Sequence, residues 1–493
     1  MSDVLYGFFT AISPINLIAA CISVGIGITI GALPGLSAAM GVALLIPITF
    51  GMNPSTGLIV LAGVYCGAIF GGSISAILIR TPGTPAAAAT AIDGYELTLQ
   101  GKAGKALGTA IIASFIGGIL SAIPLYLFAP KLAKLALMFG PAEYFWLSIF
   151  GLTIIAGAST KSMTKGLISG ALGLMISTIG MDPMFGNPRF TFGVPVLLSG
   201  VPFTASLIGL FSMSQVLLLA EKKIKESGTM IEFDNKVLLS GKELRQIIPT
   251  SLRSTVIGSI IGILPGAGAS IAAFIGYNEA KRFSKEKEKF GKGSIEGIAG
   301  AEAANNAVTG GSLIPTFTLG IPGESVTAVL LGGLMIQGLQ PGPDLFTVHG
   351  KITYTFFAGF IVVNVFMLIL GLTGSKLFAK VSRVPDSYLI PLIFSLSVIG
   401  SYAIHNNIAD VVVMFVFGFI GYFVHKFELN SASIVLALIL GPIGEAGLRR
   451  SLILNHQSYS ILFQSTVSKV LLLLTLFSLF SPIVMDKLQN RKK

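Results

Sequence analysis

Apolar segments long enough to cross a membrane recur along nearly the whole chain, and they limit its fold more than any other feature. Examples are residues 106–129, 192–220, 351–379 and 464–485. A bilayer core takes about 20 apolar residues per helical crossing. The segments also lack the alternation of polar and apolar residues that is typical of membrane β-strands. Of the 493 residues, 53% are hydrophobic and only 11% are charged, which is too little charge for a soluble surface of this size. The sequence therefore predicts an all-α polytopic membrane protein.

The net charge of +11 has a membrane explanation, because the basic residues gather in short connections between apolar segments. Two such connections are EKKIKESG at 221–228 and EAKRFSKEKEKFGKG at 279–293. Clusters of this kind anchor cytoplasmic loops, and we expect no binding to nucleic acid. No Lys or Arg precedes Arg80 in the sequence, so we expect no secretory signal peptide. Cys21 and Cys66 lie in apolar segments, where we expect them to pack as small apolar residues.

The same helix-breaking motif interrupts two apolar segments, as GALPGLSAAM at 31–40 and GILPGAGASI at 261–270. No basic residue flanks the first motif, whereas basic residues bracket the second on both sides. The positive-inside rule then places the flanks of the first motif outside and those of the second inside. Between Thr255 and Glu279 the two arms are too short for two crossings, which predicts a re-entrant hairpin with its tip at Pro265. The first motif has longer arms, so two full spans remain an alternative there.

A second pair of motifs indicates that the chain contains a duplication. GGSISAILIRTPGTP begins at Gly71, and GGSLIPTFTLGIPGES begins at Gly310. The Leu-Pro-Gly, Gly-Gly-Ser and Pro-Gly motifs follow one another in the same order in both halves of the chain, and each is separated from its copy by nearly the same length of sequence. Three motifs in one order at nearly constant separation predict two repeats. Because basic residues flank the second motif but not the first, we expect the repeats to be inverted in the membrane.

The predicted architecture is therefore two inverted-topology repeats with re-entrant hairpins, broken helices and roughly eleven to twelve crossings. We assign the first repeat half to residues 1–220, a cytoplasmic linker to 221–253 and the second repeat half to 254–493. An ordinary bundle of an even number of helices without hairpins is the alternative.

Broken helices at corresponding places in two inverted halves are typical of secondary transporters. Backbone groups that a break leaves unpaired at membrane depth survive only against protein or a water-filled cavity. Exposed helix N-termini there favour an anion, and unwound carbonyl groups can coordinate a cation. The candidate substrate-binding residues are Pro34, Gly35, Ser37, Gly72, Ser73, Arg80, Thr81, Pro265, Gly266, Asn305, Asn306, Ser312, Pro322 and Gly323. The candidate ion-coupling residues are Asn305, Asn306, Thr309 and Ser312.

Structural explanations stand beside several of these candidates. Arg80 would recognise a carboxylate with two hydrogen bonds if it were near the site, but it could equally extend to the membrane surface, as long basic side chains do. The paired glycines could have a purely structural role, which is to let helices pack closely. We expect Glu302 to cap its helix at a water interface, Asp93 and Gly94 to form a turn, and residues 405–410 (HNNIAD) to form an external loop.

Several longer segments resemble the large membrane subunit of the tripartite tricarboxylate transporters. They are GALPGLSAAMGVALLIPITFGM, GVYCGAIFGGSISAIL, TPGTPAAAATAIDGYEL, GILPGAGASIAAFIGYNEAKRFSK, FGKGSIEGIAGAEAANNAVTGGSLIPTFTLGIPG and GLQPGPDLF. The resemblance implies a multi-pass permease of the bacterial inner membrane that works with a small membrane subunit and a periplasmic solute-binding protein. It also implies uptake of citrate or other carboxylates driven by an ion gradient. Many members carry an Asn before the first Pro-Gly region where this chain has Arg80 and Thr81, so the substrate can differ from citrate.

The resulting hypothesis is secondary active uptake of a carboxylate with Na⁺ or H⁺ as the coupling ion. The site would lie between the repeats, and alternating access would be of the elevator type by analogy with other hairpin-built transporters. No cofactor, structural metal or catalytic residue is expected. One alternative is a channel or a carrier that needs no binding protein. A remote alternative is an intramembrane serine protease, since GLSA at 35–38 resembles a nucleophile motif, although the matching GAGA lacks a serine.

Overall fold

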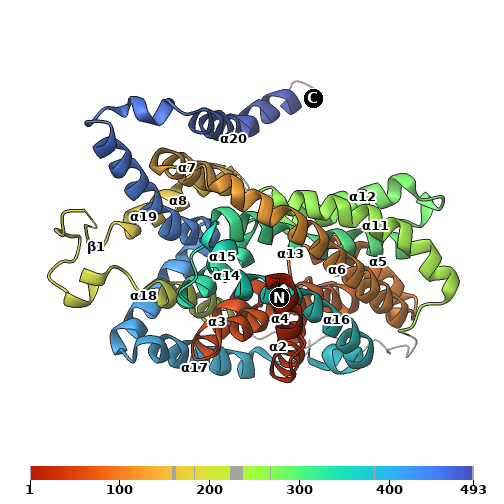
Figure 1. Ribbon diagram of the computed structural model, residues 1–493. Helices are drawn as coiled ribbons and strands as arrows, with labels where there is room; N and C mark the ends of the chain where they lie inside the picture. Colours follow the sequence, from red (N-terminus) through yellow and green to blue (C-terminus); the bar gives the residue numbers. More distant parts are fainter. Residues whose placement is uncertain are drawn as a thin grey trace.

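The computed structural model describes residues 2–157, 163–182, 184–221, 237–266, 268–381 and 384–490, and helices make up most of them (Figure 1). In these ranges the strands are β1 (Gly180–Met181) and β2 (Pro188–Arg189), which pair antiparallel. The all-α class predicted from the apolar segments is confirmed.

The helices of the first half are α1 (Asp3–Ala11), α2 (Pro14–Ala32), α3 (Ala38–Phe50), α4 (Pro54–Ile79), α5 (Ala87–Leu99), α6 (Ala103–Ala136), α7 (Pro141–Gly157), α8 (Met163–Ser177), the 3-10 turn η1 (Pro195–Ser199), α9 (Phe203–Leu207), the π-helical η2 (Ile208–Met213) and α10 (Ser214–Glu221). Those of the second half are α11 (Gly241–Ile263), α12 (Gly268–Phe283), η3 (Lys287–Lys289), α13 (Ile295–Leu319), α14 (Ser325–Ile336), α15 (Asp344–Thr347), α16 (Gly350–Val381), α17 (Asp386–His405), α18 (Ile408–Lys426), α19 (Ser431–Leu454), η4 (Tyr459–Phe463) and α20 (Thr466–Asn490). Helix α11 begins inside the linker predicted at 221–253.

Eight helices among the described residues are long and apolar enough to cross a membrane. They are α2, α4, α6, the continuous helix formed by α9, η2 and α10, and α16 to α19. Four shorter apolar helices accompany them, namely α3, α8, α14 and the first part of α20. These helices are fewer than the eleven to twelve crossings expected. Helices α3 and α14 beside the breaks are below spanning length, and α11 and α13 are long but are not among the eight.

The two halves repeat the same close packing of a broken helix on a long one. A Cβ added to Gly27 of α2 would lie 2.6 Å from the carbonyl oxygen of Val64 in α4. In the second half, a Cβ added to Gly258 of α11 would lie 2.2 Å from the carbonyl oxygen of Ala304 in α13. Gly27 and Gly258 are as far apart along the chain as the two Leu-Pro-Gly motifs, and Val64 and Ala304 are as far apart as the two Pro-Gly breaks. Small residues thus let both helix pairs approach to backbone contact, in the same register.

The long helices of the two halves pack against one another across the molecule. Helix α6 of the first half lies on α13 of the second, and α16 of the second half lies on α4 of the first. Nearly all residues of α4 and α13 are buried, and Figure 1 shows α13 in the middle of the molecule. The core is therefore shared by both halves.

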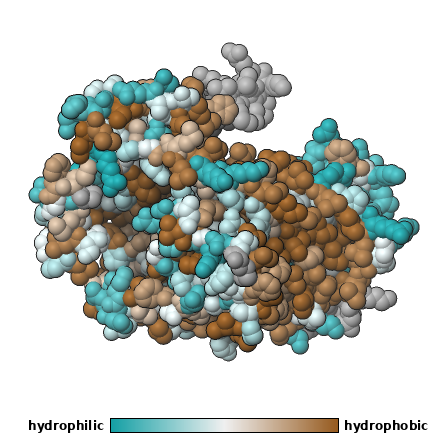
Figure 2. Space-filling model, in the orientation of Figure 1, coloured by the Kyte–Doolittle hydropathy of each residue, from teal (hydrophilic) through white to brown (hydrophobic). Residues whose placement is uncertain are grey.

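The outer face of this assembly is apolar, as a bilayer requires. Ile123, Leu127 and Phe128 of α6 are at least half exposed. Helix α11 presents an exposed apolar row four residues apart, formed by Ile248, Leu252, Val256 and Ile260. Figure 2 shows a broad hydrophobic surface over α6 and its neighbours, with hydrophilic residues gathered toward the edges. We assign this surface to contact with lipid.

Candidate functional site

The four helix breaks of the two halves meet at one cavity of about 1120 Å³. The first half contributes residues 35–39, after the first Leu-Pro-Gly tip, and residues 82–86, around the first Pro-Gly break. The second half contributes Gly266 and residues 268–271 from its tip and residues 324–326 from its break. The breaks related by sequence duplication are therefore brought together in space.

Both tips turn in the same way. Leu33 and Leu264 leave their helices in extended conformation, with ψ of 116° and 110°. Gly35 and Gly266 follow with φ of 90° and 80°, a region that residues with a Cβ rarely enter. The glycine of each Leu-Pro-Gly motif is thus needed to reverse the chain, and the proline before it ends the helical hydrogen bonding.

The two Pro-Gly breaks also share their geometry. Helix α4 ends at Arg80 with φ of 55°, and α13 ends at Gly320 with φ of 69°, both in left-handed conformation. After each cap the chain passes very close to the neighbouring broken helix. A Cβ on Gly83 would lie 2.0 Å from the carbonyl oxygen of Gly31, and one on Gly323 would lie 2.6 Å from that of Gly262.

The packing corrects one alignment made from the sequence. Gly71 packs against the backbone of Ile28 as Gly311 packs against that of Ser259, so Gly71 is equivalent to Gly311 and not to Gly310. The two copies of the Gly-Gly motif then have the same separation along the chain as the two Pro-Gly breaks, and Ser312 is equivalent to Gly72.

A carboxylate lies at the break of the second half. Glu324 lines the cavity and is the N-cap of α14. The buried Tyr65 hydroxyl, from α4 of the other half, donates to one of its oxygens, and the backbone N–H of Ala269 in α12 donates to the other at 3.3 Å. The Tyr65 and Ser312 hydroxyl oxygens are 3.1 Å apart. Glu324 therefore joins elements of both halves at the cavity wall.

Other buried polar groups near the breaks have no hydrogen-bond partner among the described residues. They are the Thr84 hydroxyl, both side-chain polar atoms of Asn305 and the Oδ1 atom of Asn306. Thr84 is 4% exposed and Asn305 is 0% exposed. Buried polar atoms are nearly always paired, so these atoms mark places where an ion, water or ligand group would be stabilised.

A separate polar cluster lies between α13, α5 and α6. Glu302 is fully buried, and it accepts hydrogen bonds from Thr90 and, at 2.9 Å, from Ser114. The amide of Asn306 donates to the Ser114 hydroxyl at 2.8 Å. The prediction that Glu302 caps its helix at a water interface is therefore wrong, because α6 covers this face of α13.

The predicted turn at Asp93 and Gly94 is also wrong, since both residues lie inside α5. Asp93 is buried and accepts hydrogen bonds from the backbone N–H groups of Gly291, Gly293 and Ser294, at 2.8 to 2.9 Å. Its carboxylate thus fixes the loop that leads into α13. At 405–410 the chain turns between α17 and α18, with His405 Nδ1 2.6 Å from Asp410 Oδ2.

The predicted site residues fall into groups. Three line the cavity, namely Gly35, Ser37 and Gly266. Ser37 is the N-cap of α3, its hydroxyl accepting from the Met40 N–H at 3.1 Å. Gly72 and Gly323 adjoin the cavity wall, since a Cβ on Gly72 would touch Thr84 and the Gly323 carbonyl accepts from the Gly266 N–H.

The remaining candidates do not line the cavity. Those that are at least partly buried are Pro34, Ser73, Pro265, Asn305, Asn306, Thr309, Ser312 and Pro322. Arg80 and Thr81 are exposed, and the Arg80 guanidinium lies 5.6 Å from the centre of the Tyr95 ring. This geometry matches the surface role considered for Arg80.

Sequence reasoning missed Tyr65, Thr84, Gln215 and Glu324. Gln215 of α10 donates to the Gly35 carbonyl and so contacts the first tip. Glu324 could have been found, because aligning TPGTP with IPGES places it opposite Thr84 directly after the shared Pro-Gly. No sequence signal pointed to Gln215, which lies at the end of the first half, shortly after a π-helical segment.

The far end of the cavity carries charge. Glu221, His425, Lys426 and Glu428 line it there, together with Asn430. Lys426 pairs with Glu221, and Lys165 lies 3.1 Å from Glu428. These lining residues lie at the end of α10, at the end of α18 and in the connection that leads into α19.

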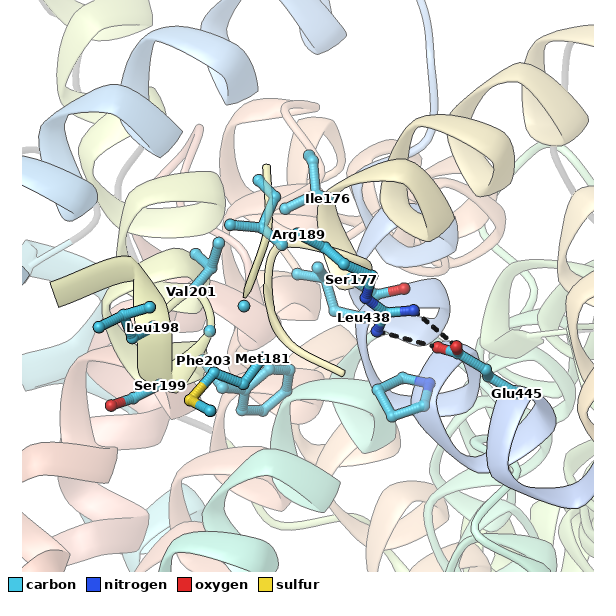
Figure 3. Close-up of a pocket in the computed structure, with 14 residues that line it drawn as sticks. Ile176, Ser177, Met181, Arg189, Leu198, Ser199, Val201, Phe203, Leu438 and Glu445 are labelled. Carbon is cyan, nitrogen blue, oxygen red and sulfur yellow. Dashed lines mark hydrogen bonds and ion pairs between the residues drawn. The ribbon is translucent and has the colours of Figure 1, made fainter. Parts of the chain in front are cut away.

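A second cavity of about 450 Å³ lies beside the β1–β2 hairpin. Figure 3 shows Arg189 and Glu445 pointing toward one another across it, with distances of 2.6 and 3.2 Å. Arg449 binds Asp182 at 2.7 Å and Glu445 at 2.8 Å. Backbone N–H groups of residues 185 and 184, followed by Arg449, lower the pKa of Asp182 to about 2. The cluster pairs each of its charges internally, so we interpret it as a link between the hairpin and α19.

Comparison with known proteins places the chain in a family. The model of the tripartite tricarboxylate transporter TctA family matches residues 17–436. An uncharacterized 52.8 kDa protein of the TAR-I ttuC' 3' region of Agrobacterium vitis is 37% identical over 473 residues, covering 96% of this chain and 94% of that protein. An uncharacterized protein of the TAR-II ttuC' 3' region of the same organism is 37% identical over 215 residues, covering 44% of this chain and 89% of its own length. No solved structure matches. The chain, a multi-pass membrane protein with paired helix breaks around one cavity, belongs to the tripartite tricarboxylate transporter TctA family.

Proposed function

We propose that this protein is the permease of a secondary active transporter that imports carboxylates across a bacterial inner membrane. The observation that carries the proposal is the meeting of four helix breaks, two from each half, at one cavity. Discontinuous helices at the interface of two repeats form the substrate and ion sites of many secondary transporters.

The chemistry of the cavity suits an anion. Helix α3 begins at Ala38 beside the cavity and α12 begins at Gly268, and a helix N-terminus carries partial positive charge and N–H groups without intrahelical partners. Outside the cavity lining, the buried polar atoms of Asn305 and Asn306 that have no partner among the described residues offer amide and carbonyl groups. Asn305, Asn306, Thr309 and Ser312 supply the oxygen ligands that Na⁺ would need. A bound cation would offset the cost of placing a carboxylate at low dielectric.

The charged end of the cavity suggests which way it opens. Lys165 and Lys426 lie there, and the positive-inside rule assigns both to the cytoplasmic side. We therefore interpret this conformation as inward-facing. Uptake would require movement of the hairpin-bearing domain to an outward-facing state, and the elevator type of movement is our working hypothesis. The small membrane subunit and the periplasmic solute-binding protein that the family name implies would complete the system.

The test is uptake into proteoliposomes that contain the chain with its small membrane subunit. Radiolabelled citrate, succinate and acetate are supplied outside with the purified binding protein, under an inward Na⁺ gradient, an inward proton gradient or neither. We expect at least one carboxylate to accumulate only with a gradient. Uptake that is equal with and without each gradient would contradict secondary active transport.

The same assay separates the alternatives. Gradient-driven uptake without the binding protein would favour an independent carrier, and dissipative flux without saturation would favour a channel. Cleavage of a membrane-embedded peptide by the purified chain, abolished in Ser37→Ala, would favour the intramembrane protease.

A further inference from the structure

The two halves differ at one chemically decisive point of the cavity. In the second half a carboxylate, that of Glu324, lies at the N-terminus of α12. One oxygen accepts from the Ala269 N–H, and the other accepts from the Tyr65 hydroxyl. Both carboxylate oxygens are thus hydrogen-bonded, and the helix N-terminus beside them is stabilised by negative charge.

The packing register shows how positions in the two halves correspond. The separation between the two Leu-Pro-Gly motifs relates Gly31 to Gly262, and the separation between the two Pro-Gly breaks relates Ala68 to Val308. Gly31 packs on the backbone of Ala68 as Gly262 packs on that of Val308. The separation of the Leu-Pro-Gly motifs therefore relates the two tips and the helices before them, α2 and α11. The separation of the Pro-Gly breaks relates the long helices α4 and α13 and the breaks that follow them.

The two separations identify the first-half equivalents of the carboxylate site. The one that holds for the tips makes Ala38 the equivalent of Ala269. The one that holds for the breaks makes Thr84 the equivalent of Glu324.

The separation of the Pro-Gly breaks also makes Asn305 of α13 the equivalent of Tyr65 of α4. Tyr65 contacts Ser312, so exchanging the two halves predicts that Asn305 faces Gly72, and Gly72 lies against Thr84. The first half therefore combines a helix N-terminus, a hydroxyl group and a side-chain amide around the position that Glu324 occupies in the second. The equivalent of the acidic Glu324 is the uncharged Thr84.

Two of these side chains lack the hydrogen-bond partners that a ligand would supply. Thr84 Oγ1 and both polar atoms of Asn305 are buried and have no hydrogen-bond partner in the described part of the chain. Thr84 lines the cavity together with Ala38 and Ala39 at the start of α3. Thr84 and the N-terminus of α3 therefore border the same cavity, and a buried donor without a partner favours a ligand that pairs it.

We propose that a carboxylate group of the substrate binds in the first half at the position equivalent to that of Glu324 in the second. It accepts hydrogen bonds from the N-terminus of α3, the Thr84 hydroxyl and the Asn305 amide. Glu324 thus serves as a built-in copy of the ligand, and its own contacts describe the geometry that the substrate adopts. This assignment rests on the proposed carboxylate transport and specifies where the substrate is held.

The test places a tethered carboxylate at the first site. Thr84→Glu supplies the side chain that the second half already has, so it should occupy the site and exclude the substrate. Thr84→Gln has the same size without the charge, and Thr347→Glu adds the same charge at an exposed position in α15. Asn305→Ala removes the amide and remains informative if Thr84→Glu does not fold.

Binding of citrate, succinate, acetate and inorganic phosphate is measured by calorimetry on the complex with the small membrane subunit in nanodiscs, at constant saturating NaCl. For the carboxylate that the wild type binds, we expect Thr84→Glu to show no saturable binding up to a hundred times the wild-type Kd. We expect Asn305→Ala to raise Kd about tenfold to a hundredfold, as for the loss of one hydrogen bond to a charged group. Thr84→Gln should bind at least tenfold more tightly than Thr84→Glu, and Thr347→Glu should match the wild type.

The outcomes separate the two proposals. If the wild type binds and transports no carboxylate, the proposed function fails before any variant is considered. If the wild type binds a carboxylate but Thr84→Glu or Asn305→Ala binds it with unchanged Kd, the assigned position is wrong. Equal loss in Thr84→Gln and Thr84→Glu would overturn the assignment as well, because bulk would explain it. Phosphate that competes as well as the carboxylate would reduce the site to a general anion site and overturn the assignment.

Discussion

The hydroxyl group of Tyr65 donates a hydrogen bond to the carboxylate of Glu324, 259 residues away in the other half of the molecule. Tyr65 is 0% exposed, and Glu324 lies at the wall of the cavity. The contact joins a long helix of the first half to the break of the second, next to the proposed site.

Tyr65→Phe should destabilise the protein, because it keeps the ring but removes a donor to a buried carboxylate. A hydrogen bond to a charged group contributes about 1.5–3 kcal/mol, so we expect a lower Tm for the purified complex and slower uptake. Glu324→Gln and the double variant complete a cycle. Since the two residues are in contact, the double variant should be less destabilised than the sum of the single effects; additivity within about 0.5 kcal/mol would show that they do not interact.

Gly83→Ala should be poorly tolerated. The added Cβ would lie 2.0 Å from the backbone oxygen of Gly31, so the break would have to move away from α2. Overpacking of this kind costs about 1–3 kcal/mol, and we expect reduced folded yield and a lower Tm in nanodiscs. Gly51→Ala is the matched control, since its Cβ meets nothing within 4 Å and its φ is −82°. A Tm unchanged in Gly83→Ala would contradict the close approach of the first break to α2.

Asp182→Asn should reduce stability in a manner that depends on pH. Hydrogen bonds from backbone N–H groups and from Arg449 lower the pKa of Asp182 from 3.8 to about 2 in the folded protein. A carboxylate with a lowered pKa stabilises the fold above its unfolded pKa, and the contribution is lost as pH falls through the folded value. The difference in Tm between wild type and variant should therefore be constant from pH 7 to 5 and shrink between pH 4 and 2. The exposed acid Glu288 provides the control variant Glu288→Gln, for which we expect no change. A difference independent of pH would contradict the ionised state of Asp182.

The inverted topology can be tested by labelling single cysteines introduced into a chain that lacks Cys21 and Cys66. Gly51 and Lys285 are exposed residues beside the first and second hairpins. Gly51→Cys should react with a membrane-impermeant maleimide from the outside of intact cells, and Lys285→Cys only after the membrane is permeabilised. Reaction of both from one side would rule out inverted repeats.

The fold could be predicted where local chemistry decides it. Gly35 and Gly266 adopt positive φ at the tips. Because this conformation favours glycine, a Leu-Pro-Gly motif inside an apolar segment indicates such a turn. The apolar segments likewise predicted helices long enough to cross a membrane, and eight such helices are present among the described residues. The repeat was visible because the same backbone geometry requires the same residues in both halves.

The site was less predictable, because it depends on which helices face each other. Glu302 and Asn305 are close in sequence, yet Glu302 hydrogen-bonds Thr90 of α5 and Ser114 of α6, whereas the polar atoms of Asn305 are buried without a partner among the described residues. Arg80 stood next to a break in the sequence but lies outside the cavity, since the left-handed cap turns the chain there. Glu324 was missed because Thr84, its equivalent in the alignment of TPGTP with IPGES, has different chemistry, and the packing register confirms that the two positions correspond.

The crossed packing of α6 on α13 and of α16 on α4 has a consequence for synthesis of the chain. Ser114 and Thr90 are made long before Glu302, their buried partner, and α4 is made long before α16 covers it. The first half emerges from the ribosome with polar groups and small-residue surfaces that only the second half can complete. Its early helices therefore remain loosely associated in the bilayer. The native arrangement can form only after most of the chain has been inserted.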